Sequence, residues 1–437
     1  MGKEKITNAN SFPKDWPIKK LADIGSTYGG LTNKSKEDFA EGNSKFITYK
    51  NIYNNTFINT NELESVRIYK DEKQNKVKYG DVFFTGSSET PDEVGISSVL
   101  LEEVDDVYLN SFCFGFRFND LKKTIPEFYG YYFRGPVFRN EVYPLAQGST
   151  RFNLSKSEMI KLKVPVPPVK EQYKIAAILS SVDEAIEKTE AIIEQTEKVK
   201  KGLMQQLLTK GIGHTKFKKS EIGEIPEEWE VKSIDELVFV NPESLSNKTN
   251  EEYEFEYIDI GSVERTGKIG ETVRYQFKNS PSRARRIVRT GDTIISTVRP
   301  YLRAFAFIDN KHDQKVCSTG FAVLRPKEKI DPVFLFQSIL NDKFVEFLKS
   351  RMTGSNYPAV TATDIKEYKL GVPRDINEQT KIAKILAKYD EKLEIEEKSL
   401  EQLQTIKKAL MQVLLTGKVR VKVDDEVNNP MTKVMGL

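Results

Sequence analysis

The 437-residue sequence has few of the side chains that metal sites and nucleophilic active sites usually require. His214 and His312 are its two histidines, and they lie in no metal-ligand spacing. Cys113 and Cys317 are too far apart in the chain to form a zinc-binding motif. No glycine-rich turn between a strand and a helix offers a cofactor site. We therefore expect a non-catalytic binding protein with no metal and no cofactor of its own.

Long hydrophobic runs are also missing. No stretch of about 18 consecutive apolar residues occurs, and the first residues of the chain are polar. We expect neither a membrane-spanning helix nor a secretory signal, and therefore a cytoplasmic protein. Each cysteine lies inside an apolar, strand-like run, which predicts two buried and reduced thiols.

A large excess of one charge is absent too. The chain has 67 Lys and Arg against 64 Asp and Glu, which gives a net charge of +3 and a pI near 8.4. Because this balance is too mild to identify a polyanionic partner, any evidence for nucleic-acid binding must come from local clusters. The hydrophobic fraction of 38% is typical of a soluble globular protein, and the length allows two or three domains.

The chain does contain one long stretch twice. The first copy is Lys170–Gly211 and the second is Asn377–Lys418. One constant shift along the chain superimposes these pairs among others: Gln172 on Gln379, Asp183 on Asp390, Leu203 on Leu410 and Met204 on Met411. A duplication at so long a period concerns the architecture of the whole molecule, and it predicts a pseudo-twofold internal repeat.

Both copies have the apolar pattern of a coiled coil. Apolar residues recur every three or four positions over roughly 40 residues, which corresponds to a helix about 60 Å long. Such a helix cannot bury its apolar stripe alone, so we expect the two copies to pair antiparallel. Two unrelated surface helices are the alternative, and the matching registers argue against it. Polar residues that fix the register or contact another subunit interrupt the seam at Thr189, Thr196, Lys200, Glu396 and Lys407.

A strand-rich domain precedes each helix. The clearest strands of the first domain are Phe46–Ile52, Gly80–Ser88 and Asn110–Phe118, followed by an aromatic helical segment that breaks near Gly135. The fold class is therefore α+β, with two mixed domains joined by two long antiparallel helices. The predicted order is domain 1–168, helix 169–210, domain 211–376, helix 377–416 and polar tail 417–437, with residues 1–12 disordered.

The second domain repeats the strand pattern of the first but not its surface. Tyr257–Val263, Gly291–Ala304 and Cys317–Pro326 correspond to the three strands of the first domain. The stretches 53–79 and 264–289, by contrast, have almost nothing in common. A duplicated scaffold with two divergent surfaces suggests that the protein reads two different targets by one method.

The densest basic cluster lies in the second domain. Arginine forks bind phosphate oxygens and pair with guanine in the major groove, and a tyrosine beside them can stack or donate a hydrogen bond. A solvated pair of strands is the alternative. The cluster consists of Arg283, Arg285, Arg286, Arg289, Arg299, Tyr301 and Arg303, and we select all but Arg289 as candidate DNA contacts.

Polar loops supply further candidate contacts. The loop of the first domain that corresponds to the basic cluster carries hydroxyl groups, although such loops are often only turns. A second loop precedes the exit segment of each domain. The candidates on these loops are Thr85, Ser87, Ser88, Arg151, Asn153, Asn356 and Tyr357.

These motifs resemble those of a known family. The segments GDVFFTGSSETPDEVG and NSFCFGFRF resemble one class of target-recognition domain, and GDTIISTVRPYLRA with CSTGFAVLRP resembles another. The two long repeats are similar to conserved spacer helices. Together, and in this order, they resemble the DNA-specificity subunit of type I restriction-modification systems over nearly the whole chain.

The resemblance implies a function and a set of partners. Each domain would read one half of a bipartite, asymmetric site in double-stranded DNA, and the helices would set the spacer. Two adenine-methyltransferase subunits, which bind S-adenosylmethionine, would dock on the helices and flip the target base. Two restriction/translocase subunits would join them, with ATP and magnesium confined to the partners.

The helix ends are candidates for docking the methylating subunits, and an ordinary coiled-coil end is equally consistent with their pattern. These positions are Leu203, Met204, Leu207, Leu410, Met411 and Leu414. Three other functions remain open at this point. The chain could be a nuclease with an unrecognised site, a scaffold that never touches DNA, or the recognition subunit of a related system that cuts on both sides of its site.

Overall fold

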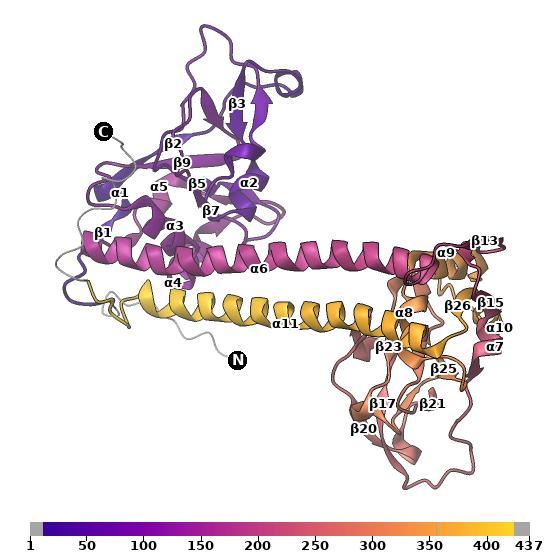
Figure 1. Cartoon of the computed structure of the whole chain (residues 1–437). Coiled ribbons are helices and arrows are strands. Elements are labelled where there is room, and N and C mark those ends of the chain that lie inside the picture. The colour runs from indigo at the N-terminus through magenta and orange to yellow at the C-terminus, as the bar shows by residue number, and fades with distance from the viewer. Residues whose placement is uncertain (1–11, 355, 424–437) are drawn as a thin grey trace. The chain divides into compact units, whose positions relative to one another are not determined.

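The computed structural model describes residues 12–354 and 356–423 (Figure 1). The predicted disordered start, except for Phe12, and the end of the tail from Asp424 lie outside these residues. The chain divides into two compact units. Unit 1 is Met1–Thr189 with Ser399–Leu437, and unit 2 is Glu190–Lys398. Each unit thus joins one strand-rich domain to a part of each long helix.

The first domain is built on an antiparallel sheet whose strand order is β2-β9-β5-β7. A second sheet has the order β4-β3-β8, with β3 and β8 parallel, and β1 pairs with β12. The strands are β1 Ile18–Lys20, β2 Gly25–Gly29, β3 Ser44–Ile47, β4 Glu64–Val66, β5 Val82–Thr85, β6 Ser87–Ser88, β7 Ser97–Val99, β8 Val107–Leu109, β9 Cys113–Phe118, β10 Ala146–Gln147, β11 Phe152–Leu154 and β12 Lys163–Pro165.

Aromatic helices cover the main sheet of unit 1. The predicted break falls at Gly135, between α3 and α4, because Pro136 begins the second helix. The rings of Phe84, Phe133 and Phe138 meet at centroid distances of 4.6–6.2 Å. The helices are α1 Leu21–Ile24, α2 Tyr49–Asn54, α3 Pro126–Arg134, α4 Pro136–Val142, α5 Lys156–Met159 and α6 Val169–Lys210.

Unit 2 repeats this topology and adds one strand, β21, to the second sheet. Its main sheet has the order β16-β25-β22-β23, its second sheet β20-β17-β24-β21, and β15 pairs with β26. Strands β17 and β24 are parallel, as β3 and β8 are. The strands are β13 Phe217–Ser220, β14 Gly223–Pro226, β15 Trp229–Ser233, β16 Val238–Val240, β17 Glu254–Ile258, β18 Val263–Arg265, β19 Lys268–Ile269, β20 Val273–Gln276, β21 Ala284–Ile287, β22 Thr293–Ser296, β23 Phe305–Phe307, β24 Val316–Ser318, β25 Phe321–Pro326 and β26 Lys369–Pro373.

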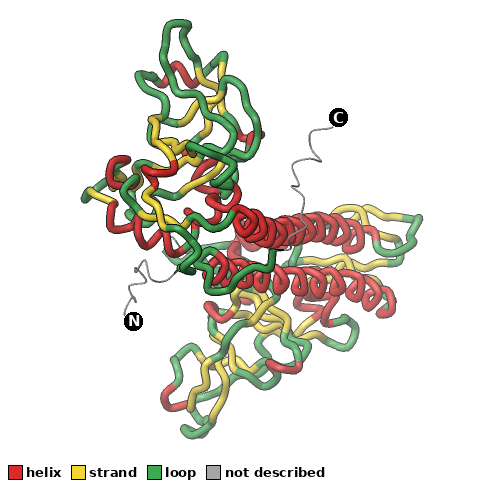
Figure 2. Tube along the Cα trace, turned by 90° about the vertical axis from the view of Figure 1, so that its left-hand side faces the viewer, coloured by secondary structure: helices red, strands yellow, loops and turns green. Residues whose placement is uncertain are grey.

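The helices of the second half follow the order of those in the first, except that a 3-10 turn, Ile260–Ser262, takes the place of α2. Loops (green in Figure 2) connect the short elements. They are α7 Ile234–Leu237, α8 Pro332–Ile339, α9 Asp342–Arg351, α10 Ala362–Lys366 and α11 Ile376–Leu414. The α+β class with an internal repeat and two long helices is thereby confirmed.

Buried polar contacts recur at equivalent positions of the two units. Gln172 accepts a hydrogen bond from Ile125 N (2.8 Å) and donates to two backbone carbonyls. Gln379 accepts in the same way from Asp331 N (2.8 Å) and donates to two carbonyls. Each glutamine therefore fixes the start of its long helix to its own domain.

The two long helices pair antiparallel within each unit. In unit 1, Lys407 of α11 forms an ion pair with Asp183 of α6 (2.6 Å), which also accepts from Tyr131 (2.9 Å). In unit 2, Lys200 of α6 forms an ion pair with Asp390 of α11. These two pairs occupy equivalent positions, so two of the predicted seam breaks, Lys200 and Lys407, connect the helices.

Three strand predictions were wrong, and one correspondence was wrong in part. The strand expected at Tyr257–Val263 ends at Ile258, because Asp259 caps a 3-10 turn, Ile260–Ser262. The stretch Gly291–Ala304 holds the short strand β22 followed by a second 3-10 turn, Pro300–Leu302. The strand expected at Phe46–Ile52 ends at Ile47, because Thr48 caps the helix α2 through a hydrogen bond from Asn51 N (3.1 Å). The cysteines are buried as predicted, and burial raises the pKa of both thiols to about 12. The predicted correspondence of Cys317–Pro326 with the strand Asn110–Phe118 holds only in part, because Cys113 begins β9 whereas Cys317 lies on β24, and β25 is the counterpart of β9.

Candidate nucleic-acid interface

The predicted contacts of unit 1 meet where the strand β5 ends. Strand β6 follows β5 directly and pairs with β11, which places Ser87 opposite Asn153. Leu154 N donates to Gly86 O (2.9 Å), and Gly86 N donates to Phe112 O (2.9 Å). Two loops far apart in the sequence are therefore held side by side by backbone hydrogen bonds.

An arginine lies on an exposed aromatic ring at this point. The guanidinium of Arg151 is 5.1 Å from the ring centroid of Phe112, and its Nε donates to the Ser87 hydroxyl (2.8 Å). Phe112 is 54% exposed, and Arg151 and Asn153 are exposed as well. The side-chain contacts orient the guanidinium without neutralising its charge. We call Ser87, Phe112, Arg151 and Asn153 the unit 1 recognition cluster.

The other two hydroxyl candidates have structural partners. Thr85 is fully buried, and its hydroxyl donates to Glu93 O (2.7 Å) and accepts from Ile96 N (2.9 Å). Ser88 is also buried and donates to the Glu93 carboxylate. Both side chains hold the loop that returns to β7, so they position the recognition cluster.

Unit 2 joins two loops at the equivalent place. Val298 bridges Ala359, Arg299 N donates to Pro358 O (2.8 Å), and Val360 N donates to Thr297 O (2.9 Å). These bonds attach the loop after β22 to the loop before α10.

An arginine again lies on an exposed ring. The guanidinium of Arg299 is 5.3 Å from the centroid of Tyr357, and its Nη2 donates to Asn356 O (3.2 Å). Tyr357 is 74% exposed. Arg299, Asn356 and Tyr357 form the unit 2 recognition cluster. Its arginine comes from the loop after the central strand, whereas the arginine of unit 1 comes from the other loop.

The turn after Arg299 projects two more side chains. A 3-10 turn, Pro300–Leu302, leaves Tyr301 38% and Leu302 66% exposed. Arg303 ends this turn and points back into the unit, where it donates to Leu340 O (2.9 Å) and forms an ion pair with Asp342. Arg303 therefore anchors the turn.

The remaining arginines of the basic cluster lie in different surroundings. Arg286 is half-buried, and burial lowers the pKa of its guanidinium. Arg285 stacks on Phe277 at 4.8 Å. Arg283 is exposed and is also connected to the loop that carries Arg299. Its carbonyl accepts a hydrogen bond from Thr319 N (2.8 Å). The next residue, Gly320, accepts one through its carbonyl from Thr297 N (2.8 Å), on the loop of Arg299.

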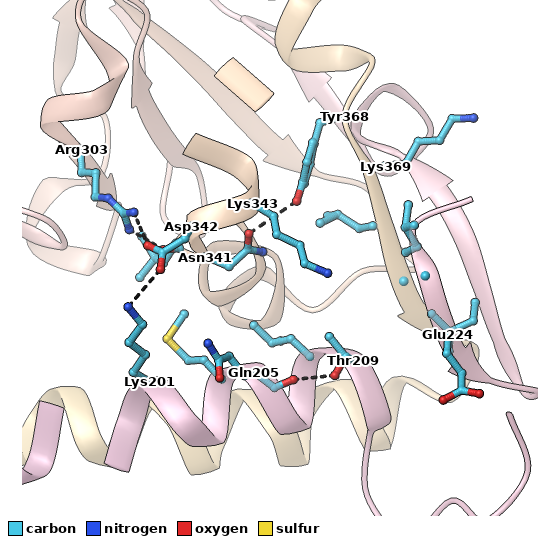
Figure 3. A pocket seen from close by; sticks show the side chains of 18 residues that line it. Lys201, Gln205, Thr209, Glu224, Arg303, Asn341, Asp342, Lys343, Tyr368 and Lys369 are labelled. Carbon is cyan, nitrogen blue, oxygen red and sulfur yellow. Dashed lines mark hydrogen bonds and ion pairs between the residues drawn. The ribbon is translucent and has the colours of Figure 1, made fainter. Parts of the chain in front are cut away.

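A groove of about 880 Å³ lies elsewhere in unit 2, against α6 (Figure 3). Asp342 closes one end by pairing with Arg303 and with Lys201 (3.1 Å). The apolar part of its lining includes Met204, Leu208, Ile222, Ile225 and Leu370. The recognition cluster does not contribute to this lining, so the groove is separate from the proposed DNA contact.

The predicted docking positions pack inside their own units. Leu207 and Leu414 are 7% and 4% exposed, and both belong to the hydrophobic core of their unit. The other four positions pack against the same cores and are partly buried: Leu203, Met204, Leu410 and Met411. Exposed apolar side chains on the two long helices are Val199 and Ile406, at equivalent positions, and also Ile192, Ile376 and Ile395.

Sequence reasoning missed Phe112 and Leu302. Phe112 lies within a run that reads as a strand, and Leu302 reads as one more apolar residue of a strand pair. The available signal was the turn-forming proline at position 300, which interrupts that strand pattern.

Comparison with known proteins agrees with this architecture. The model of the type I restriction modification DNA specificity domain matches the chain twice, at residues 13–198 and 226–405. This chain belongs to the type I restriction-modification specificity subunits. Their role is DNA sequence recognition, and specificity subunits are non-catalytic.

Two relatives match nearly the whole chain. The putative MjaX specificity subunit of Methanocaldococcus jannaschii is 32% identical over 96% of this chain and 97% of its own length. The MjaIX specificity subunit of the same organism is 25% identical, with 96% of each chain covered. A crystal structure of an S subunit from M. genitalium shares the fold, with a TM-score of 0.58, 17% identity, and 94% and 97% of the two chains covered.

The described residues lack both a membrane-spanning helix and a metal-binding cluster of side chains. Within residues 12–354 and 356–423, no helix is long and apolar enough to cross a membrane. The same residues contain no group of three or more His, Cys, Asp or Glu side chains that could hold a metal ion.

Proposed function

We propose that this specificity subunit reads a bipartite, asymmetric DNA site, with one half contacted by each recognition cluster. The supporting observation is an arginine stacked on an exposed aromatic ring at the equivalent place of each unit. The two clusters share a location but not their residues. They would therefore recognise different bases, and the whole site would be asymmetric.

The chemistry of the clusters suits nucleic acid. A guanidinium binds phosphate oxygens or pairs bidentately with guanine, and the ring beneath keeps it in place at low entropic cost. Asn153 of unit 1 carries an amide, which pairs bidentately with adenine in the major groove. Hydrogen-bonded loops on a rigid sheet supply the preorganisation that sequence readout needs.

The partners follow from the same proposal. Adenine-methyltransferase subunits dock on the long helices and bring S-adenosylmethionine, and restriction/translocase subunits bring ATP and magnesium. The equivalent side chains Val199 and Ile406 are 37% and 47% exposed. They are better placed for docking than the seam residues, which already pack within their own units.

Methylation mapping of DNA from cells that express the chain with a methylating partner tests the readout. The wild type should produce methyl-adenine in both halves of one split motif. Arg151→Ala should relax or abolish recognition of one half only, and Arg299→Ala should do the same for the other half. Loss of one bidentate contact costs about 1–3 kcal/mol of base discrimination.

Arg351→Ala is the matched control, because Arg351 also stacks on an aromatic ring, Phe347 (5.2 Å), but on α9. This variant should leave the motif unchanged. If Arg151→Ala and Arg299→Ala also left both half-sites intact in an assembled complex, the proposed readout would be wrong.

Docking has a separate test. Val199→Asp and Ile406→Asp should each weaken co-purification with the methylating subunit, because a buried charge at an interface is costly. Lys198→Asp, which changes the charge one position along α6, serves as the control. Equal retention of the partner by all three variants would exclude these positions as the dock.

A further inference from the structure

The two most exposed large hydrophobic side chains in the described residues lie beside Arg299. They are Tyr357, 74% exposed, and Leu302, 66% exposed. Arg299 contacts the Tyr357 ring directly, and Leu302 N donates to Arg299 O (2.9 Å). Adjacent exposed apolar groups mark an interaction site, whereas scattered ones are common on any surface.

The turn that carries Leu302 is held rigidly. Pro300 is buried, and both flanking arginines have the left-handed backbone conformation, with φ of 47° at Arg299 and 54° at Arg303. Left-handed conformations are unfavourable for residues other than glycine and persist where the surroundings enforce them. Here the enforcing contacts are Arg299 N to Pro358 O (2.8 Å) and the anchor of Arg303 on Leu340 O.

This arrangement fits insertion into stacked bases. We propose that the turn 299–303 is a DNA-inserting prong, in which Leu302 enters between neighbouring base pairs of the half-site read by unit 2 while Arg299 contacts the adjacent backbone or guanine. The inference rests on the proposed function. Unstacking a base step is unfavourable, and the burial of the Leu302 side chain together with the added contacts must offset its cost.

Unit 1 has no comparable prong among its described residues. In the register of the central strands, Ser88 takes the place of Arg299, and the exposed residues that follow it, Glu89 and Thr90, are polar. Its exposed ring, Phe112, lies under the Arg151 guanidinium. Only the half-site of unit 2 should therefore become unstacked, and this local opening would lower the cost of extruding a neighbouring base for methylation.

The test uses the assembled complex of the full chain with its methylating subunit and duplexes that carry 2-aminopurine at single positions of each half-site. Binding of the wild type should raise the fluorescence several-fold at one step in the half-site of unit 2. Leu302→Ala should abolish that rise. Leu302→Met, which keeps a long apolar side chain, should preserve it.

Val273→Ala is the matched control, because Val273 is 54% exposed on β20 of the same unit but lies on the distal sheet. Tryptophan emission of each variant made in the Trp16→Phe background, where Trp229 is the one remaining tryptophan, checks that unit 2 is folded. The experiment is run without S-adenosylmethionine and with a cofactor-site variant of the partner, so that base extrusion by the methylating subunit does not contribute.

The outcomes separate the two proposals. If Leu302→Ala binds the specific duplex and retains the full fluorescence rise, the prong is refuted and the readout by Arg299 stands. The prong is also refuted if the fluorescence rises equally in both half-sites. If the wild-type complex prefers no split motif at all, the proposed function itself fails.

Discussion

The two recognition clusters lie on the same scaffold, or frame, of a sheet with two hydrogen-bonded loops. They take their arginine from opposite loops of it. In unit 1 the loop before α5 supplies Arg151, and the loop after β5 supplies the hydroxyl that orients it. In unit 2 the loop after β22 supplies Arg299, and the loop before α10 supplies the ring and the carbonyl. The location of the contact is thus a property of the fold, whereas its chemistry is free to vary.

The frame is maintained by buried polar contacts that both units repeat. Asp81 accepts two hydrogen bonds from Arg117 (2.6 and 2.7 Å) and one from Lys78 N. Asp292 accepts two from Arg325 (both 2.9 Å) and one from Arg289 N. The third member of each group differs. In unit 1 the Tyr28 hydroxyl donates to Asp81, whereas in unit 2 Glu243 forms an ion pair with Arg325.

Removing the buried aspartate should produce the largest difference between the units. Asp81→Asn leaves Arg117 without a carboxylate, and breaking such a pair costs about 3 kcal/mol, the lower end of the usual range, since Arg117 is partly exposed. Asp292→Asn should cost about half as much, because Arg325 retains Glu243. Urea unfolding followed by tryptophan emission measures both.

Each unit contains one of the two tryptophans, so the signals can be separated. Trp229→Phe leaves Trp16 to report on unit 1, and Trp16→Phe leaves Trp229 to report on unit 2. Each single-tryptophan protein is the control for the aspartate variant made in it. Equal losses of stability in both units would show that Glu243 does not compensate.

The helices could be predicted from the sequence because their signal is local and repeated. A period of 3.5 residues, seen twice in the same register, leaves one economical partner for each apolar stripe. The buried glutamines follow the same logic, since Gln172 and Gln379 stand at equivalent positions at the beginning of both copies. Features that appear in both copies can be predicted because they belong to the scaffold that the two units share.

The recognition clusters could be predicted only in part, because their side chains depend on contacts between distant segments. Six arginines look alike in the sequence, yet Asp342 binds Arg303 and Glu243 binds Arg289. Neither acid is near its arginine in the chain. The exposure of Leu302 depends on two left-handed residues, which no pattern of hydrophobicity reveals.

The equivalent ion pairs between the helices offer a second, smaller test of the symmetry. Double-mutant cycles with Asp183→Asn and Lys407→Met, and with Asp390→Asn and Lys200→Met, should each give a coupling energy of about 1 kcal/mol. The two values should agree, because each aspartate also accepts a second hydrogen bond, from Tyr131 or Gln337.

The ion pair Glu194–Lys198, exposed along one turn of α6, is the control for these cycles and should give about 0.5 kcal/mol or less. Urea unfolding of the single-tryptophan proteins provides the measurement. A coupling in only one unit would mean that the two halves of the helix pair are not energetically equivalent.

The smallest expected effect is a loss of stability at acidic pH. It depends on the Glu243 carboxylate of unit 2, which has no counterpart in the frame of unit 1. Hydrogen bonds from Arg289 and then Arg325 lower the pKa of Glu243. A group with a lowered folded pKa stabilises the protein above its ordinary value near 4.5, and this stabilisation disappears as the pH falls through the folded value. Because Glu243 is 34% exposed, we expect at most about 1 kcal/mol.

Glu243→Gln should therefore destabilise unit 2 at pH 7 and matter progressively less below about pH 4.5, so that wild type and variant converge in acid. Unit 1 has Gly30 at the equivalent position, and its Trp16 signal should not respond to the substitution. A stability difference that stayed constant from pH 7 to pH 3 would show that Glu243 acts through packing, and the contrast between the two frames would then not be electrostatic.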